Sequence, residues 1–171
     1  MKLLSSGALL GALVATSAFA ALPDGHVAPD FTTQASLADA LKKGPVVLYF
    51  YPAAFTPGCT VEAHDFAEAT DKFKALGATV IGVSHDSVDT LNRFSVSECR
   101  NKFAVASDAD QSIMKAYDSV LAMKPEYANR TSYVIAQDGT IAYSYTAMNP
   151  GQHVANTMAA VEKLKASGKK S

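Results

Sequence analysis

The sequence predicts an α/β fold in which a mixed central sheet carries helices on both faces. Short apolar runs alternate with segments of helical pattern through the first two thirds of the chain, as in parallel strands joined by helical crossovers. Later, two runs of alternating polar and apolar residues flank a tight-turn sequence at residues 137–139, which is typical of a hairpin. Parallel crossovers followed by an antiparallel pair give a mixed sheet.

The individual elements follow from apolar periodicity and from the residues that end helices. The expected strands are short apolar runs at residues 46–51, 78–84, 104–106, 130–136 and 140–145. The expected helices have apolar residues at helical spacing and cover residues 36–43, 60–76, 110–117 and 152–165. A further helix is expected between the second and third of these, beginning after an N-cap at Asp86 or Ser87 and running to about residue 102. Gly77 is the expected C-cap of the second helix, and residues 119–129 are expected to be irregular.

Length and composition are those of a globular protein. The chain has 171 residues, of which 49% are hydrophobic and 18% are charged, and it has ample length to bury a core. A formal net charge of −1 provides no electrostatic basis for binding nucleic acid or an anionic membrane. No repeat or linker divides residues 21–171, so we expect a single domain over this range.

The first twenty residues have the composition of a secretory signal peptide. Lys2 precedes an apolar stretch at residues 8–15, and Ala18-Phe19-Ala20 supplies the small residues of a cleavage site. We therefore expect residues 1–20 to be removed and the mature chain to be exported, to the periplasm, with no stable membrane association. The alternative is an uncleaved membrane anchor, although the apolar stretch is short for a membrane span.

Cys59 occupies the position that most clearly indicates chemistry. It lies between an apolar strand and the next helix, where unpaired backbone N–H groups and the helix dipole favour an anion. The thiolate is the reactive form of cysteine. The alternative is a structural disulfide with Cys99, the only other cysteine, because exported proteins often carry such bonds. Two cysteines cannot make a four-cysteine zinc site, and Cys59 and His64 are not on one helix face.

The residues around Cys59 resemble the active-site sequence of the peroxiredoxins. The pattern Pro52-x-x-x-Thr56-x-x-Cys59, followed by Thr60 and Glu62, is most similar to the bacterioferritin-comigratory, or peroxiredoxin Q, branch. The likeness extends over about residues 27–145. It implies the thioredoxin-like fold of that family, which agrees with the predicted order of elements.

The resemblance assigns a role to each matching residue. It implies that Cys59 is the peroxidatic cysteine, which attacks a hydroperoxide and becomes a sulfenic acid. Thr56 would hydrogen-bond the substrate oxygens, and Pro52 would shield the thiolate from water. Arg130 stands at the position of the family arginine, whose guanidinium stabilises the thiolate and the leaving oxygen. Glu62 corresponds to the acid that helps to hold that arginine.

The sequence departs from the family pattern at the second cysteine. Many peroxiredoxin Q proteins have a resolving cysteine five residues after the first, and here that residue is His64, which we interpret as a solvated or half-buried helix residue. Cys99 falls on the next predicted helix, where some members place the resolving cysteine about one turn earlier, at the position of Ser95. Cys99 is therefore either the resolving cysteine, reached by local unwinding, or an inert buried thiol.

The favoured function is that of an exported thiol peroxidase that reduces hydrogen peroxide or small organic hydroperoxides. The resemblance implies electrons from a thioredoxin-like protein or a small thiol, no metal, haem or flavin, and a monomer. A general thiol–disulfide oxidoreductase would normally have Cys-x-x-Cys, whereas Glu62 stands three residues after Cys59. A non-catalytic redoxin-fold binding module with a structural Cys59–Cys99 disulfide is the remaining alternative.

Overall fold

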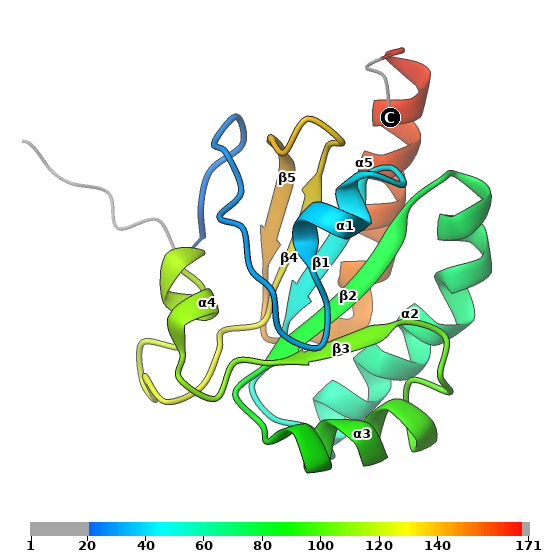
Figure 1. The fold of residues 1–171 in the computed structure, drawn as a ribbon. Helices are drawn as coiled ribbons and strands as arrows, with labels where there is room; N and C mark the ends of the chain where they lie inside the picture. Colours follow the sequence, from blue (N-terminus) through cyan, green and yellow to red (C-terminus); the bar gives the residue numbers. More distant parts are fainter. Residues whose placement is uncertain (1–20, 169–171) are drawn as a thin grey trace, which may run out of the picture.

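The computed structural model describes residues 21–168, which form a central sheet with helices on each side (Figure 1). The predicted signal peptide, residues 1–20, lies outside the described residues, so its cleavage and the expected export stay predictions. Among the described residues, no helix is both long and apolar enough to cross a membrane.

The sheet has five strands in the order β3-β2-β1-β4-β5. The strands are β1 (Val46–Phe50), β2 (Thr79–Ser84), β3 (Ala104–Ser107), β4 (Thr131–Ile135) and β5 (Ile141–Thr146). Strands β1, β2 and β3 are mutually parallel, whereas β4 runs antiparallel to β1 and to β5. The parallel half and the hairpin half were both predicted, and the strand positions agree with the prediction to within one or two residues.

Helices cover both faces of the sheet and enclose a separate apolar core on each. One core contains side chains from α2 (Pro57–Ala75), α3 (Val88–Ser97) and α5 (His153–Ala166). The other contains side chains from α1 (Leu37–Leu41) and α4 (Ser112–Ala116), together with the N-terminal segment that begins at Ala21. Figure 1 shows α2 and α5 on the side of the sheet away from α4. The predicted fold class is therefore confirmed.

Two helix boundaries differ from the prediction by three residues or more. Helix α2 begins at Pro57 rather than at residue 60, because proline fits the first turn, where its missing N–H is not needed. Helix α3 ends at Ser97 rather than near residue 102. Arg100 and Asn101, with φ of 52° and 53°, adopt the left-handed conformation and turn the chain away from the helix axis. Cys99 is thus in the turn after α3 and not on the helix.

The register of β1 against β4 places the candidate site residues near one another. Phe50, the last residue of β1, is paired with Thr131, the first residue of β4. The loop that follows β1 leads to Cys59, and Arg130 immediately precedes β4. Because the two strands are antiparallel neighbours, the end of one lies beside the start of the other. Residues 59 and 130 therefore meet although they are far apart in sequence.

Candidate active site

Cys59 lies in the first turn of α2 and is almost completely buried. Its exposed fraction is 1%, and it belongs to the apolar core between the sheet and α2. Thr56 occupies the N-cap position, and its carbonyl accepts the N–H of Thr60, which is the first hydrogen bond of the helix. The positive end of the α2 dipole is therefore directed at the turn that carries the sulfur, which favours a negative charge there.

The guanidinium of Arg130 lies against the sulfur of Cys59. Its Nη2 is 3.5 Å from Cys59 Sγ, and its Nη1 donates to Glu62 Oε2. Its Nε donates to the backbone carbonyl of Met148 at 2.9 Å, which fixes the plane of the guanidinium. Burial lowers the pKa of Arg130, but the acidic Glu62 and Cys59 outweigh it and raise this pKa further above its ordinary value. Arg130 is therefore a permanent cation at the sulfur.

Gly58 makes room for this contact. A Cβ added at position 58 would lie 3.0 Å from Nη2 of Arg130, closer than most Cβ contacts allow. Its backbone is in a helix, so the requirement for glycine here is one of space rather than of φ. The absence of a side chain next to the cysteine lets the guanidinium approach the start of α2.

Asp86 holds the loop between β1 and α2. Its Oδ2 accepts the N–H of Ala54 at 2.8 Å and the hydroxyl of Ser84 at 2.7 Å. The neighbouring residue His85 also contacts this loop, because its Nδ1 lies 3.1 Å from the carbonyl oxygen of Pro52. The sequence offered Asp86 or Ser87 as the N-cap of α3, and the structure assigns that role to Ser87. Asp86 instead anchors the Cys59 loop. This role was not predicted, because an aspartate after a strand suits either role.

Thr56 and Pro52 lie in the loop that leads to the sulfur. The Thr56 hydroxyl is exposed, makes no cap hydrogen bond and donates to the carbonyl of Ala53 at 2.9 Å. Pro52 follows β1 and is half-buried. The structure therefore brings Cys59, Arg130 and Glu62 into contact and places Pro52 and Thr56 in the loop that connects β1 to α2.

Glu62 is a buried carboxyl group behind the guanidinium. It lies one turn after Cys59 on α2 and has an exposed fraction of 0%. Burial raises the pKa of Glu62 to about 8, although Arg130 opposes this rise. On its other side, Oε1 lies 3.5 Å from Nδ1 of His153, the first residue of α5. His153 was not predicted from the sequence, because nothing local in its segment indicates a buried partner on another helix.

Comparison with known proteins identifies the family. Residues 21–144 match the model of the AhpC/TSA family. The chain belongs to the AhpC/TSA family. It is 32% identical over 178 residues to the chloroplastic peroxiredoxin Q of Oryza sativa subsp. japonica, covering 92% of this chain and 82% of that protein. It is 32% identical over 143 residues to peroxiredoxin Bcp of Escherichia coli strain K12, covering 77% of this chain and 90% of that protein.

The fold is also similar to that of solved peroxiredoxins. The crystal structure of peroxidoxin BcpB from Mycobacterium tuberculosis has a TM-score of 0.76 and 29% sequence identity, covering 82% of this chain and 97% of that one. These comparisons confirm two predictions: the resemblance to the peroxiredoxin Q and Bcp branch, and the thioredoxin-like fold. The protein is a peroxiredoxin and therefore a thiol peroxidase.

The second cysteine of this peroxiredoxin is buried in the same apolar core as Cys59. Cys99 is a free thiol, as is Cys59, and its N–H donates to the carbonyl of Phe94 at 3.1 Å. Burial raises the pKa of Cys99 to about 12, and the neighbouring Glu98 adds to this rise. A thiol with this pKa is almost entirely protonated at neutral pH, so Cys99 is a poor nucleophile in this conformation.

A row of three side-chain contacts holds the segment around Cys99 against α2. Two of them are ion pairs, and in the third His64 is charged only when it is protonated. The row joins Glu98 to His64 at 2.8 Å, Arg100 to Glu68 at 3.7 Å and Lys102 to Asp71 at 3.3 Å. The three α2 residues recur at i, i+4 and i+7, so they share one face of the helix. His64 is half-buried, as predicted, and occupies one end of the row.

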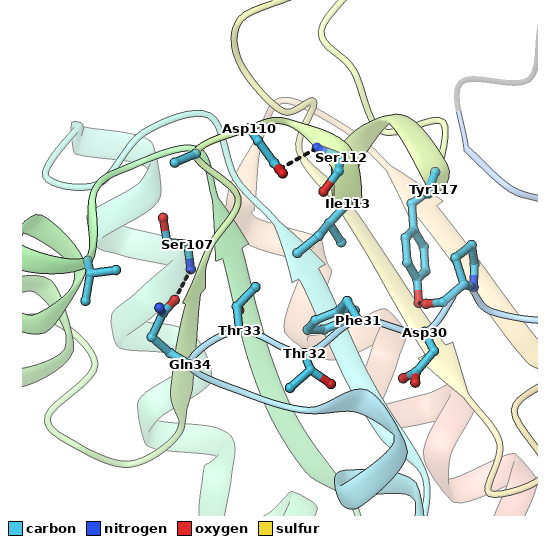
Figure 2. Close-up of a pocket in the computed structure, with 14 residues that line it drawn as sticks. Asp30, Phe31, Thr32, Thr33, Gln34, Ser107, Asp110, Ser112, Ile113 and Tyr117 are labelled. Atoms are coloured by element: carbon cyan, nitrogen blue, oxygen red, sulfur yellow. Dashed lines mark hydrogen bonds between the residues drawn. The ribbon is translucent and has the colours of Figure 1, made fainter.

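A hollow between residues 29–34 and α4 has no redox-active group in its wall (Figure 2). Its volume is about 570 Å³. Two polar side chains in its wall are bonded within the chain, since Gln34 accepts from the Ser107 N–H and Tyr117 donates to the Pro29 carbonyl. Within residues 21–168, no group of three or more His, Cys, Asp or Glu side chains is placed to hold a metal ion.

The raised pKa of Glu62 predicts a specific pH dependence of stability. The folded protein binds a proton at Glu62 up to about pH 8, whereas the unfolded chain releases it near the ordinary value of 4.5. Between these values the free energy of unfolding therefore falls as pH rises, by up to about 1.4 kcal/mol per pH unit from this group. Glu62→Gln removes this contribution, so urea denaturation from pH 5 to 8 should give a shallower fall than in the wild type.

The matched control is Glu68→Gln, an exposed glutamate on the same helix. It should leave the pH slope of the unfolding free energy close to that of the wild type. Equal slopes for Glu62→Gln and the wild type would contradict a protonated Glu62 in the folded protein.

Proposed function

We propose that this peroxiredoxin is an exported peroxidase that reduces hydrogen peroxide or small organic hydroperoxides through Cys59. The thiolate of Cys59 attacks one peroxide oxygen, an S–O bond forms and the O–O bond breaks. The sulfur is oxidised to a sulfenic acid, and the other oxygen leaves and takes a proton to give water or an alcohol. The observation that carries this proposal is the contact of 3.5 Å between the Arg130 guanidinium and Cys59 Sγ.

The residues around the sulfur fit this step. Arg130 can stabilise both the thiolate and the negative charge that develops on the leaving oxygen, and it is held in one orientation by Met148 and Glu62. The Thr56 hydroxyl is exposed at the start of α2, where it can hydrogen-bond a peroxide oxygen. In this proposal, Pro52 in the preceding loop limits the access of water to the sulfur.

Cys99 is the candidate for resolving the sulfenic acid, and an external thiol is the alternative. In the internal route, the Cys99 thiol attacks the Cys59 sulfenic sulfur, a disulfide forms and water leaves. Burial of Cys99 and its high pKa require the turn after α3 to open before this attack. In the external route Cys99 stays buried, and Cys59 forms a mixed disulfide with a small thiol or a protein.

The reductant in this proposal is a thioredoxin-like protein or a small thiol, and the protein acts as a monomer. A thiol reductant fits a site in which the sulfur of Cys59 is the redox centre. A general thiol–disulfide oxidoreductase is disfavoured, because it would have a second cysteine three positions after Cys59. That position holds Glu62, whose carboxyl group accepts a hydrogen bond from Arg130. A non-catalytic binding module is disfavoured by membership of a peroxidase family.

Oxidation with one equivalent of hydrogen peroxide separates the two resolving routes. If Cys99 resolves Cys59, intact-mass analysis of the reduced protein should show the loss of two hydrogens, and Cys99→Ser should instead gain one oxygen. If Cys99 is inert, the wild type should itself gain one oxygen or pass into a disulfide-linked dimer. In both routes Cys59→Ser should abolish peroxide consumption, and retained consumption by this variant would contradict the proposed nucleophile.

The row of side-chain contacts predicts that the internal route speeds up when the row is weakened. Exposed ion pairs each contribute about 0–1 kcal/mol, so removal of two of them should speed disulfide formation about two- to fivefold. The test variant is Glu68→Gln with Asp71→Asn, which removes two pairs without touching Cys99. The rate is measured by acid quenching and mass analysis after a pulse of peroxide.

The control for this test is Asp39→Asn, which removes the exposed ion pair with Lys42 on α1. It should leave the rate of disulfide formation unchanged. A double variant no faster than this control would show that the row does not limit the release of Cys99.

Export is the part of the proposal that rests on the first twenty residues. Their charged, apolar and small-residue regions support cleavage after Ala20. Expression of the full chain in a Gram-negative host should give a periplasmic protein whose mass corresponds to a start at Ala21. Retention of residues 1–20 in a membrane fraction would support the uncleaved anchor instead.

A further inference from the structure

His153 is a buried polar residue behind the peroxidase site that the proposed reaction does not use. It is the first residue of α5 and has an exposed fraction of 0%. Its Nε2 lies 2.8 Å from the carbonyl of Ala147, and its Nδ1 lies 2.8 Å from Oγ of Ser132. The same Nδ1 lies 3.5 Å from Glu62 Oε1. The ring therefore connects α5, β4 and the loop after β5 to the glutamate that contacts Arg130.

The hydrogen bond to Ala147 determines which ring nitrogen carries hydrogen. A carbonyl oxygen can only accept, so Nε2 of His153 must donate. In the neutral ring, Nδ1 is then an acceptor, and the Ser132 hydroxyl can donate to it. A second acceptor, Glu62 Oε1, faces the same nitrogen. Two facing acceptors repel unless a proton lies on one of them, so the geometry favours one proton between Glu62 and His153.

The charges around Arg130 also favour a proton on the Glu62–His153 pair. The guanidinium contacts two acidic groups, the sulfur of Cys59 and the carboxyl of Glu62. If both were anions, one buried cation would face two buried negative charges, which is costly in a dry environment. Glu62 Oε1 has no hydrogen-bond partner among the described residues, although it is buried. A proton there would make the group neutral, and Oε1 could then direct it toward Nδ1 of His153, 3.5 Å away.

We propose that Glu62 and His153 share one buried proton that balances the charge of the Cys59 thiolate, so that His153 is a positioning residue for the peroxidase reaction. This inference rests on the proposed function of Cys59. Burial raises the pKa of Glu62 to about 8 and lowers the pKa of His153, so the proton resides mainly on Glu62 at neutral pH. His153 holds the protonated carboxyl in the orientation that leaves Oε2 to Arg130.

The buried group formed by Cys59, Arg130 and the Glu62–His153 pair has no net charge before or after the reaction. Before it, the thiolate and Arg130 balance each other, and Glu62 is protonated. As the S–O bond forms and the O–O bond breaks, the sulfur loses its charge and the leaving oxygen takes one proton. The Glu62–His153 pair releases one proton to solvent at the same stage, which offsets the proton that the leaving oxygen takes up, so Arg130 then balances the Glu62 carboxylate. The net charge of the group is zero in each state.

Other charged and titratable groups face the pair from the surrounding elements. Arg130, which immediately precedes β4, lowers the pKa of both His153 and Glu62, whereas Asp65 on α2 raises the pKa of Glu62. The Tyr145 ring of β5 packs edge-on against His153, with ring centres 4.9 Å apart. Apart from the pair itself, only Cys59, on the other side of Arg130, changes its charge during the proposed reaction. The coupling is therefore expected between the pair and residue 59.

The first test is the pH profile of the reaction of the reduced protein with excess hydrogen peroxide, measured by stopped flow. The variant is His153→Gln, whose amide can still donate to Ala147 but cannot take a proton from Glu62. We expect the pH at which the rate constant is half-maximal to rise by about one unit. At pH values below the wild-type midpoint, the variant should therefore react about tenfold more slowly. The rate at high pH should stay close to that of the wild type.

The matched control is Val161→Ala, a buried residue of the same helix that has no polar contact with the site. It should lower the free energy of unfolding and leave the pH midpoint unchanged. If His153 were only structural, His153→Gln would lower the rate by the same factor at every pH, as a general loss of order does. That result, or superimposable profiles, would overturn the proposal.

The second test is reciprocal and does not require a change at His153. The ring ¹⁵N shifts of His153 are followed by NMR against pH in the reduced wild type and in Cys59→Ser, which has no thiolate. Because coupling acts equally in both directions, the pair should lose its proton at a pH at least about one unit lower in Cys59→Ser. Identical titrations would refute the coupling. Failure of the wild type to consume peroxide would instead refute the proposed function.

Discussion

One buried guanidinium, that of Arg130, faces two acidic groups, and the arrangement of the whole site depends on how its charge is divided between them. It contacts Cys59 Sγ on one side and Glu62 Oε2 on another, and its Nε is committed to the carbonyl of Met148. Water would normally share in balancing such charges, but all three side chains are buried. The protonation of Glu62 is therefore linked to the chemical state of the sulfur.

The fold supplies the rigidity that this arrangement needs. Strand β1 is fully buried between β2 and β4, and its register against β4 brings the Cys59 loop to Arg130. Asp86, at the end of the neighbouring parallel strand, fixes the loop by accepting the N–H of Ala54. Gly58 leaves space for the guanidinium. Each constraint acts on backbone or on a buried side chain, so the distance between nitrogen and sulfur does not depend on flexible surface groups.

The sequence was sufficient for the order of elements, because apolar runs and turn residues carry that information locally. Strand β1, the hairpin of β4 and β5, and Cys59 at the start of a helix were all predicted. The end of α3 was not, because Arg100 and Asn101 adopt left-handed conformations without a glycine to signal them. The roles of Asp86 and His153 were also missed, because each depends on a partner in a distant segment. Contacts of this kind leave no periodic pattern in a single sequence.

The turn that carries Cys99 is less stable than its contacts alone would indicate. Two consecutive residues other than glycine, Arg100 and Asn101, have positive φ. The left-handed conformation costs about 1–2 kcal/mol for an ordinary residue and less for asparagine. This strain offsets part of the stabilisation from apolar burial and from the charged row. Opening the turn relaxes the backbone, so exposure of the second sulfur is less costly than withdrawing an unstrained side chain from a core.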